Sequence, residues 1–276
     1  MSRFMLSYIE RDSLVHKLCG ATKFLFFLLW SILAMMTFDT RILLTMAVGG
    51  IFLFSVSRTK PAEVSFIFKL LLAFMAMNLG AIYVFAPEQG VLLYGTRHVL
   101  FEGIGRFTVT AEQLFYELNV FLKYLIVAPV AIVLMVTTHP TEFASSLNRI
   151  GMPYAVAFAI SLTLRYIPDV QREYQDISRS QQARGIELSK KTSVWKRLKG
   201  SSAILMPLVF SSLERIDVIS HAMELRGFGK NKKRTWYSGR PFARRDFLVL
   251  GISVLLFALG ILITFADGNR FWNPFL

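Results

Sequence analysis

The chain has only one cysteine, Cys19, and four histidines in 276 residues. One cysteine excludes a disulfide framework within the chain and a zinc site built from several thiolates. The histidines are scattered outside any HExxH sequence, so we expect no metal site. There is no Gly-x-Ser-x-Gly elbow, and the one Gly-Lys pair, Gly229-Lys230, lacks the upstream glycine of a P-loop. The sequence therefore predicts a non-catalytic chain without a cofactor of its own.

Charged residues are also scarce. They make up 18% of the chain, against about 25% in an ordinary soluble domain. Hydrophobic residues reach 54%, with 25 phenylalanines. This composition indicates a membrane protein.

Five apolar stretches have about the length that a membrane-spanning helix needs, although the second is short and could be a tilted partner of the first. They are residues 21–38, 41–57, 64–86, 118–138 and 247–266. We predict an all-α integral membrane protein with about five transmembrane helices. In residues 90–110, apolar and polar residues alternate weakly and glycines occur at turn-like positions, which predicts a short extracellular hairpin.

Three polar residues lie inside these apolar stretches. Lys69 and Lys123 are near predicted helix ends, where a long side chain can reach the lipid headgroups, and we favour that interpretation over a functional charge. Asn78 is near the middle of the third stretch, and we expect it to form a hydrogen bond with a neighbouring helix.

The net charge of +13 is unevenly distributed, and this predicts the orientation. Residues 1–23 and the pair Arg58 and Lys60 are basic, and residues 139–246 hold 19 Lys and Arg against 9 Asp and Glu. The connection 86–119 is acidic instead. Because basic loops remain on the cytoplasmic side, we expect a cytoplasmic N-terminus. The positive charge is then a topology signal, and no nucleic-acid partner is needed to explain it. The predicted regions are transmembrane residues 1–138, a cytoplasmic region 139–246, and a last helix with an extracellular tail, 247–276.

The cytoplasmic region has a helical pattern rather than that of a loop. PTEFASSLNRIG, residues 140–151, predicts a short helix closed by its glycine. Two longer amphipathic helices follow, at about 153–185 and, after the basic linker 190–200, at 201–227; each contains a proline. The apolar run of the first, residues 155–164, is too short to span a bilayer, and we place both helices near the inner membrane surface.

Both long helices are predicted to end in an Arg-Gly pair: Ala183-Arg184-Gly185 and Leu225-Arg226-Gly227. Glycine after the last helical turn is a common C-cap, and a basic residue there complements the helix dipole. That explanation suffices for one copy. Two copies on the cytoplasmic side favour a binding role, because an exposed guanidinium offers five donors to a partner.

At these positions the chain resembles the transmembrane T component of energy-coupling factor (ECF) transporters, the EcfT/CbiQ family of prokaryotic vitamin and metal importers. The similar segments are SLVHKL at 13–18, TTHPTEF at 137–143, LNRIGMPY at 147–154, LRYIP at 164–168, the tripeptide at 183–185, Pro207, and AMELRGF at 222–228.

The resemblance implies a scaffold in a prokaryotic cell membrane. Two cytosolic ABC ATPases, which bind ATP and Mg²⁺, would dock on the Arg-Gly helix ends, and a small substrate-binding membrane subunit would pack on the apolar face. ATP-driven motion would then pass to that subunit for uptake of a vitamin or other micronutrient. The implied ATPase-coupling residues are Ala183, Arg184, Gly185, Glu187, Glu224, Leu225, Arg226 and Gly227. The implied docking face for the substrate subunit is Ile167, Val170, Tyr174, Leu208, Leu213 and Ile216.

Three alternatives stay open, and one of them is a non-transporting membrane scaffold, which is distinguished by whether substrate uptake depends on the chain. A conventional ABC importer permease also couples through a cytoplasmic helix, but such permeases resemble one another in a single glutamate-led loop. An integral membrane enzyme acting on lipid phosphates would need clustered carboxylates for Mg²⁺, and Asp169, Glu173 and Asp176 are the nearest candidates.

Overall fold

The computed structural model describes residues 11–102, 107–186, 194–230, 235–236, 239–266 and 271–274. They form two compact units. Unit 1 is Met1–His139 with Arg240–Leu276, and unit 2 is Pro140–Gly239.

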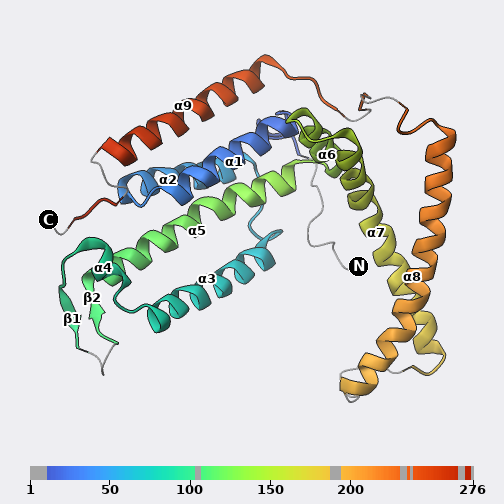
Figure 1. The fold of residues 1–276 in the computed structure, drawn as a ribbon, viewed down its shortest axis with the longest axis horizontal. Helices are drawn as coiled ribbons and strands as arrows, with labels where there is room; N and C mark the ends of the chain where they lie inside the picture. The colour runs from blue at the N-terminus through green and yellow to red at the C-terminus, as the bar shows by residue number, and fades with distance from the viewer. Residues whose placement is uncertain are drawn as a thin grey trace. The chain divides into compact units, whose positions relative to one another are not determined.

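Unit 1 is built almost entirely from helices (Figure 1). These are α1 (Gly20–Met36), α2 (Thr40–Val56), α3 (Ser65–Phe85), α4 (Gln89–Tyr94), α5 (Ala111–Thr137) and α9 (Arg244–Ala266). A short antiparallel pair, β1 (Val99–Phe101) and β2 (Val109–Thr110), follows α4. The predicted all-α membrane fold is confirmed. The hairpin was expected over 90–110, but the first part of this range is helical, as α4, and the strand pair begins at Val99.

The five predicted apolar stretches correspond to α1, α2, α3, α5 and α9. Three of these helices, α3, α5 and α9, are long and apolar enough to cross a membrane. Both α1 and α2 have 17 residues, so each is about 25 Å long and shorter than a hydrocarbon core of about 30 Å. The sequence predicted a short helix only for the second apolar stretch, whereas α1 and α2 have equal lengths.

Helix α5 forms the centre of unit 1 and contacts α1, α2, α3 and α4, while α9 packs on α1. Small and aliphatic side chains fill the α1–α2–α5 interface, because close approach of helices in lipid depends on packing. They are Leu33, Ala34, Ile42, Leu43, Met46, Ala47, Leu122 and Ile126. A smaller cluster, Val64, Ile132 and Val136, lies where the start of α3 meets α5.

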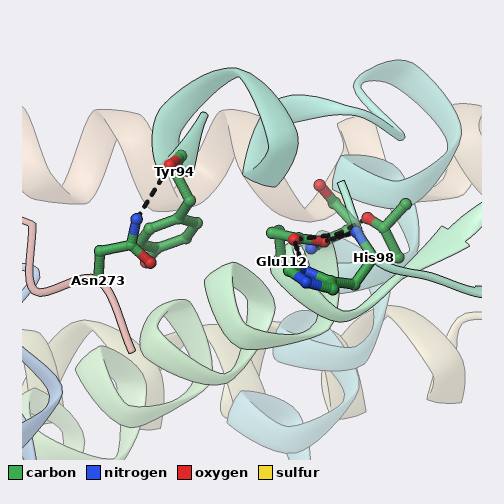
Figure 2. A network of polar contacts seen from close by, with 6 residues as sticks. Tyr94, His98, Glu112 and Asn273 are labelled. Atoms are coloured by element: carbon green, nitrogen blue, oxygen red, sulfur yellow. Dashed lines mark hydrogen bonds and ion pairs between the residues drawn. The ribbon is translucent and has the colours of Figure 1, made fainter. Parts of the chain in front are cut away.

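A set of polar groups at one end of unit 1 is joined by hydrogen bonds. Thr40 Oγ1 donates to Asn119 Oδ1 at 2.7 Å, and Asn119 Nδ2 donates to the Tyr94 hydroxyl at 3.3 Å. Figure 2 shows Asn273 donating to the Tyr94 carbonyl, and the backbone N–H and ring Nδ1 of His98 facing the Glu112 carboxylate. These bonds hold α4, the β pair and residue 273 on the end of α5.

Lys123 corrects one sequence-based interpretation. It is buried, its Nζ donates to the Met35 carbonyl at 3.2 Å, and it lies 3.2 Å from the centroid of the Phe38 ring. It therefore does not extend to the headgroups. The interpretation was wrong because α5 begins at Ala111, seven residues before the predicted start, which moves Lys123 from the first turns into the helix interior. Lys69 is exposed on α3.

Unit 2 consists of α6 (Pro140–Arg149), α7 (Tyr154–Ala183) and α8 (Val194–Leu225). The short helix and both long amphipathic helices were predicted, and the long ones continue through Pro168 and Pro207. Helix α8 starts at Val194, inside the predicted basic linker. Lysine and arginine are good helix formers, so a basic stretch can extend a helix as easily as separate two.

Candidate functional site

Helices α7 and α8 form an antiparallel pair. Near the end of α7, Gln181 Nε2 donates to the Ala203 carbonyl in the first half of α8 at 3.3 Å. At the opposite end, Leu162 and Thr163 of α7 face Ile219 and Met223 of α8 across a cavity of about 340 Å³. The C-terminus of each helix therefore lies beside the N-terminal half of the other.

A shared carboxylate joins the middle of the pair. Glu173 on α7 forms an ion pair with Arg215 on α8 and accepts a hydrogen bond from the Ser211 hydroxyl. The Arg215 guanidinium also lies 5.9 Å from the centroid of the Tyr166 ring. Because this group is partly buried and has several partners, it orients the two helices more firmly than an exposed ion pair would.

The C-terminus of α7 has a Schellman cap. Arg184 is the last near-helical residue, and Gly185 adopts a φ of +88°, which a residue with a Cβ rarely adopts. The Gly185 N–H donates to the Gln182 carbonyl at 3.0 Å, and the Ile186 N–H donates to the Gln181 carbonyl at 3.1 Å. These two bonds define the motif.

The C-terminus of α8 repeats the same cap. Gly227 has a φ of +66°, its N–H donates to the Glu224 carbonyl at 2.8 Å, and the Phe228 N–H donates to the Met223 carbonyl at 2.9 Å. Arg226 occupies the position that Arg184 has on α7. The second Arg-Gly therefore repeats the first in backbone geometry as well as in sequence.

The cap explains the glycine of each pair and leaves the arginine exposed. Arg184 and Arg226 are both exposed, next to helix C-termini whose carbonyl dipoles favour positive charge. Met223 and Thr163 line the same cavity, and Arg184 is 21 residues beyond Thr163 along α7. At 1.5 Å per residue the two arginines are therefore roughly 30 Å apart, at opposite ends of the pair.

An aromatic cluster anchors the chain just after Arg226. Phe228 packs on Phe158 at 4.7 Å and on Tyr154 at 5.9 Å, between ring centroids, and Tyr154 lies 5.3 Å from Trp236. The Trp236 indole N–H donates to Asn148 Oδ1 at 3.1 Å. This cluster connects the end of α8 to the start of α7.

The predicted docking residues divide into two groups. Val170 and Ile216 border the cavity between α7 and α8. Ile167, Tyr174 and Leu213 do not line it and are 44%, 42% and 51% exposed, while Leu208 is half-buried.

The apolar surface of α8 is wider than predicted. The additional exposed side chains are Leu205, Met206, Val209 and Phe210. Together with Leu213 and Ile216 they follow a spacing of three and four residues over three turns, a signal that the sequence carried. We call Leu205, Met206, Val209, Phe210, Leu213 and Ile216 the α8 apolar face.

The other predicted coupling residues next to the two arginines are exposed. Glu224 and Leu225 are exposed beside Arg226, with Leu225 at 89%, and Ala183 is exposed beside Arg184. Glu187 lies outside the described residues.

The three carboxylates considered for Mg²⁺ do not form a cluster. Asp169 and Asp176 each approach an arginine on their own helix, at 3.8 and 3.7 Å, and Glu173 bonds to α8. Within the described ranges, no group of three or more His, Cys, Asp or Glu side chains could hold a metal ion.

Residues 11–237 match the model of the family described as "CbiQ: Cobalt transport protein". The chain belongs to this family. The match covers most of the membrane helices and all of the α6–α8 region, so it includes both Arg-Gly ends. The resemblance predicted from the motifs is thereby confirmed.

Curated relatives agree with this assignment. A protein of Bacillus selenitireducens named "Energy-coupling factor transporter transmembrane protein EcfT" is 28% identical over 270 residues, which are 92% of this chain and 94% of that protein. The protein of the same name from Exiguobacterium sibiricum is 30% identical over 62% of this chain and 66% of its own length, just under two thirds. The protein of the same name from Bacillus subtilis is 24% identical over 91% of this chain and 94% of its own length.

Proposed function

We propose that the chain is the transmembrane coupling component of an ECF-type importer. In this role it transmits ATP-driven motion from two cytosolic ATPases to a small substrate-binding membrane subunit. The observation that carries the proposal is the duplicated helix end, at which an exposed arginine on a Schellman cap occurs once at each end of one antiparallel helix pair. Family membership and the names of the relatives support it.

The separation of the two arginines favours two separate ATPase partners. Roughly 30 Å is about the diameter of a small domain, so neighbouring domains could each receive one arginine. Movement of these domains would then act on both ends of a pair whose middle is held by Glu173, Ser211 and Arg215. ATP and Mg²⁺ would be bound by those partners.

The α8 apolar face, with Ile167 and Tyr174, is the proposed docking surface for the substrate-binding subunit. Large exposed apolar patches on a protein mark interaction sites. Such a face at a membrane boundary suits a partner that moves or exchanges, since side chains without fixed internal partners can repack. The imported compound, a vitamin or another micronutrient, would be recognised by that subunit.

The proposed topology follows the charge distribution. The basic regions would be cytoplasmic, with the N-terminus inside, and the connection with α4 and the β pair would lie outside the cell membrane. Cysteine accessibility in intact cells tests this. A Cys19→Ser background carrying one new cysteine at residue 97 should react with an impermeant maleimide, and one at residue 172 should not.

Affinity purification in mild detergent tests the coupling role. The wild-type chain should retain two ATPase chains and a small membrane protein. The double variant Arg184→Glu/Arg226→Glu should lose the ATPases, because a wrong-sign charge in a buried interface costs several kcal/mol. The control is Arg172→Glu/Arg179→Glu, which makes the same charge change on exposed positions of α7. Retention of the ATPases by the Arg184/Arg226 double variant would contradict the proposal.

Two other outcomes would favour the alternatives. A soluble binding protein recovered in place of the small membrane protein would indicate a conventional permease. A chain purified alone that hydrolyses lipid phosphates with added Mg²⁺ would indicate a membrane enzyme.

A further inference from the structure

Unit 1 contains an apolar cavity of about 370 Å³ where four helix ends meet. Lys23 is near the start of α1, Val56 ends α2, Thr137 ends α5, and Arg245 is near the start of α9. These ends share one face of unit 1, the face that the charge distribution assigns to the cytoplasm. The cavity extends from Thr137 to Val130, two helical turns or about 10 Å along α5.

The walls of the cavity are almost entirely hydrocarbon. Aliphatic and aromatic side chains of α1, α2, α5, α9 and residues 14–18 form them, and three polar residues complete the lining. The apolar residues are Leu14, Val15, Leu18, Phe26, Leu53, Val56, Val130, Val133, Leu134, Leu248 and Val249; the polar ones are Lys23, Thr137 and Arg245. An apolar space of this size next to lipid suits a hydrocarbon chain, because its eleven apolar wall residues offer water no hydrogen bonds to replace those it would lose.

A polar pocket of about 380 Å³ adjoins the cavity and shares Leu14 and Val56 with it. Its other lining residues are Asp12, Ser13, Lys17, Ser55 and Arg58. Lys17 pairs with Asp12 at 2.8 Å, and this ammonium lowers the pKa of the Asp12 carboxyl, so the carboxylate is present but neutralised. With Arg58 as a second cation beside this ion pair, the lining of the pocket has a net positive charge.

The two cationic groups that line the cavity differ in their hydrogen bonding. Lys23 is buried and its Nζ donates to the Thr137 carbonyl at 2.8 Å. Arg245 is exposed on the cavity rim and makes no hydrogen bond or ion pair with the part of the chain that the structure describes. Its five donors are therefore available to an anionic group at the cavity mouth.

We propose that this paired site binds one anionic phospholipid, with an acyl chain in the cavity and its phosphate near Arg245 and the Lys17–Arg58 pocket. The combination argues for a phospholipid: the cavity accepts hydrocarbon, the rim accepts a phosphate, and both lie at helix ends where lipid headgroups occur. The proposal is independent of ATPase coupling, so either can fail alone.

Native mass spectrometry of the full chain released from nanodiscs tests the proposal. With equal phosphatidylglycerol and phosphatidylcholine, the wild type should retain one phosphatidylglycerol molecule. Arg245→Gln should weaken that preference about fivefold, since a basic residue near an anionic surface contributes about 1 kcal/mol. Val249→Trp, which fills the cavity, should lower lipid retention at least about tenfold, because each excluded CH₂ of the acyl chain contributes about 0.8 kcal/mol.

Each variant has a matched control on α9. Arg244→Gln removes the neighbouring exposed arginine, which does not line the cavity, and Val254→Trp enlarges a lipid-exposed valine. Both should bind like the wild type. A loss of lipid in Val249→Trp counts only if Cys19 stays as protected from maleimide as in the wild type; Arg245→Gln, at the surface, tests the site without altering its packing.

Three results would overturn the proposal. One is equal retention of both lipids by the wild type. Another is an unchanged lipid profile in Val249→Trp and Arg245→Gln. The last is binding of inorganic phosphate alone that displaces the lipid, which would indicate a free-anion site.

Discussion

The two units use their apolar residues in opposite ways. In unit 1 the aliphatic side chains of α1, α2 and α5 are buried against one another, and Leu43 and Ile126 have no exposed surface. In unit 2, within the described residues, only Ala157 of α7 and Ile204 of α8 are buried apolar residues at the α7–α8 pair, and the α8 apolar face is about half exposed. Unit 1 thus has a packed interior, and its exposed apolar side chains on α3 and α9 belong to helices that are apolar enough to cross a membrane. Unit 2 exposes its apolar face on α8, which is not one of those helices.

This contrast predicts where substitutions affect stability and where they affect binding. Cys19 is the only cysteine and is buried, so its rate of reaction with a maleimide reports opening of unit 1 without an introduced cysteine. The predictions below run from the largest expected effect on stability to the smallest.

Asp246→Ala should be the most destabilising change. The buried Asp246 carboxylate accepts the Cys19 N–H and the Ala243 N–H, both at 2.8 Å. These are the N-cap positions of α1 and α9, so one side chain caps both helices. Removing it leaves two donors without a partner, which should cost about 3 kcal/mol and speed Cys19 labelling. Asp246→Asn should be intermediate. Asp217→Ala, on an exposed position of α8, should leave labelling unchanged.

Leu43→Ala should cost about 2 kcal/mol or more, because it opens a cavity in the α1–α2–α5 interface. Leu44→Ala is the matched control, since the neighbouring side chain is 51% exposed on the same helix. Unfolding in a denaturing detergent, followed by circular dichroism, measures both. Equal effects of the two substitutions would mean that unit 1 lacks the packed core described above.

How far the sequence predicted these features depends on the range of the interactions. Hydropathy over about 20 residues identified the apolar helices, and the repeated Arg-Gly identified both caps. The start of α5 was missed although a local signal existed: the Gln113 N–H donates to Thr110 Oγ1, and Thr110-Ala-Glu-Gln113 is a capping-box sequence.

Other features depend on long-range contacts that no local pattern contains. Asp246 meets Cys19 across 227 residues, and the apolar cavity forms from helix ends that are distant in the chain. The width of the α8 apolar face was underestimated for a different reason: on a helix of mostly apolar residues, periodicity alone does not separate side chains buried by α7 from those left exposed.

Gly185→Ala should cost about 1 kcal/mol, confined to unit 2. Among the described residues, chain neighbours aside, no atom lies within 4 Å of the point that an alanine Cβ would occupy, so we attribute the strain to the φ of +88°. Gly251→Ala, also with nothing within 4 Å but in the regular helix α9, is the control. Hydrogen exchange of the last turn of α7 should rise in Gly185→Ala alone. An unchanged exchange rate would mean that the cap does not hold this helix end.

Leu213→Asp should have the smallest effect on stability and a large effect on assembly. The side chain is half exposed and does not line the α7–α8 cavity, so an aspartate there remains hydrated. We expect Cys19 labelling and the circular dichroism of unit 2 to match the wild type within about 0.5 kcal/mol. Purification should then recover the ATPases without the small membrane protein, because an unpaired carboxylate in an apolar interface is costly to desolvate. Glu214→Asp, at the next and exposed position, is the control. Loss of the ATPases together with the small protein would show that the two surfaces of unit 2 are not separable, and retention of both would remove the α8 apolar face from the interface.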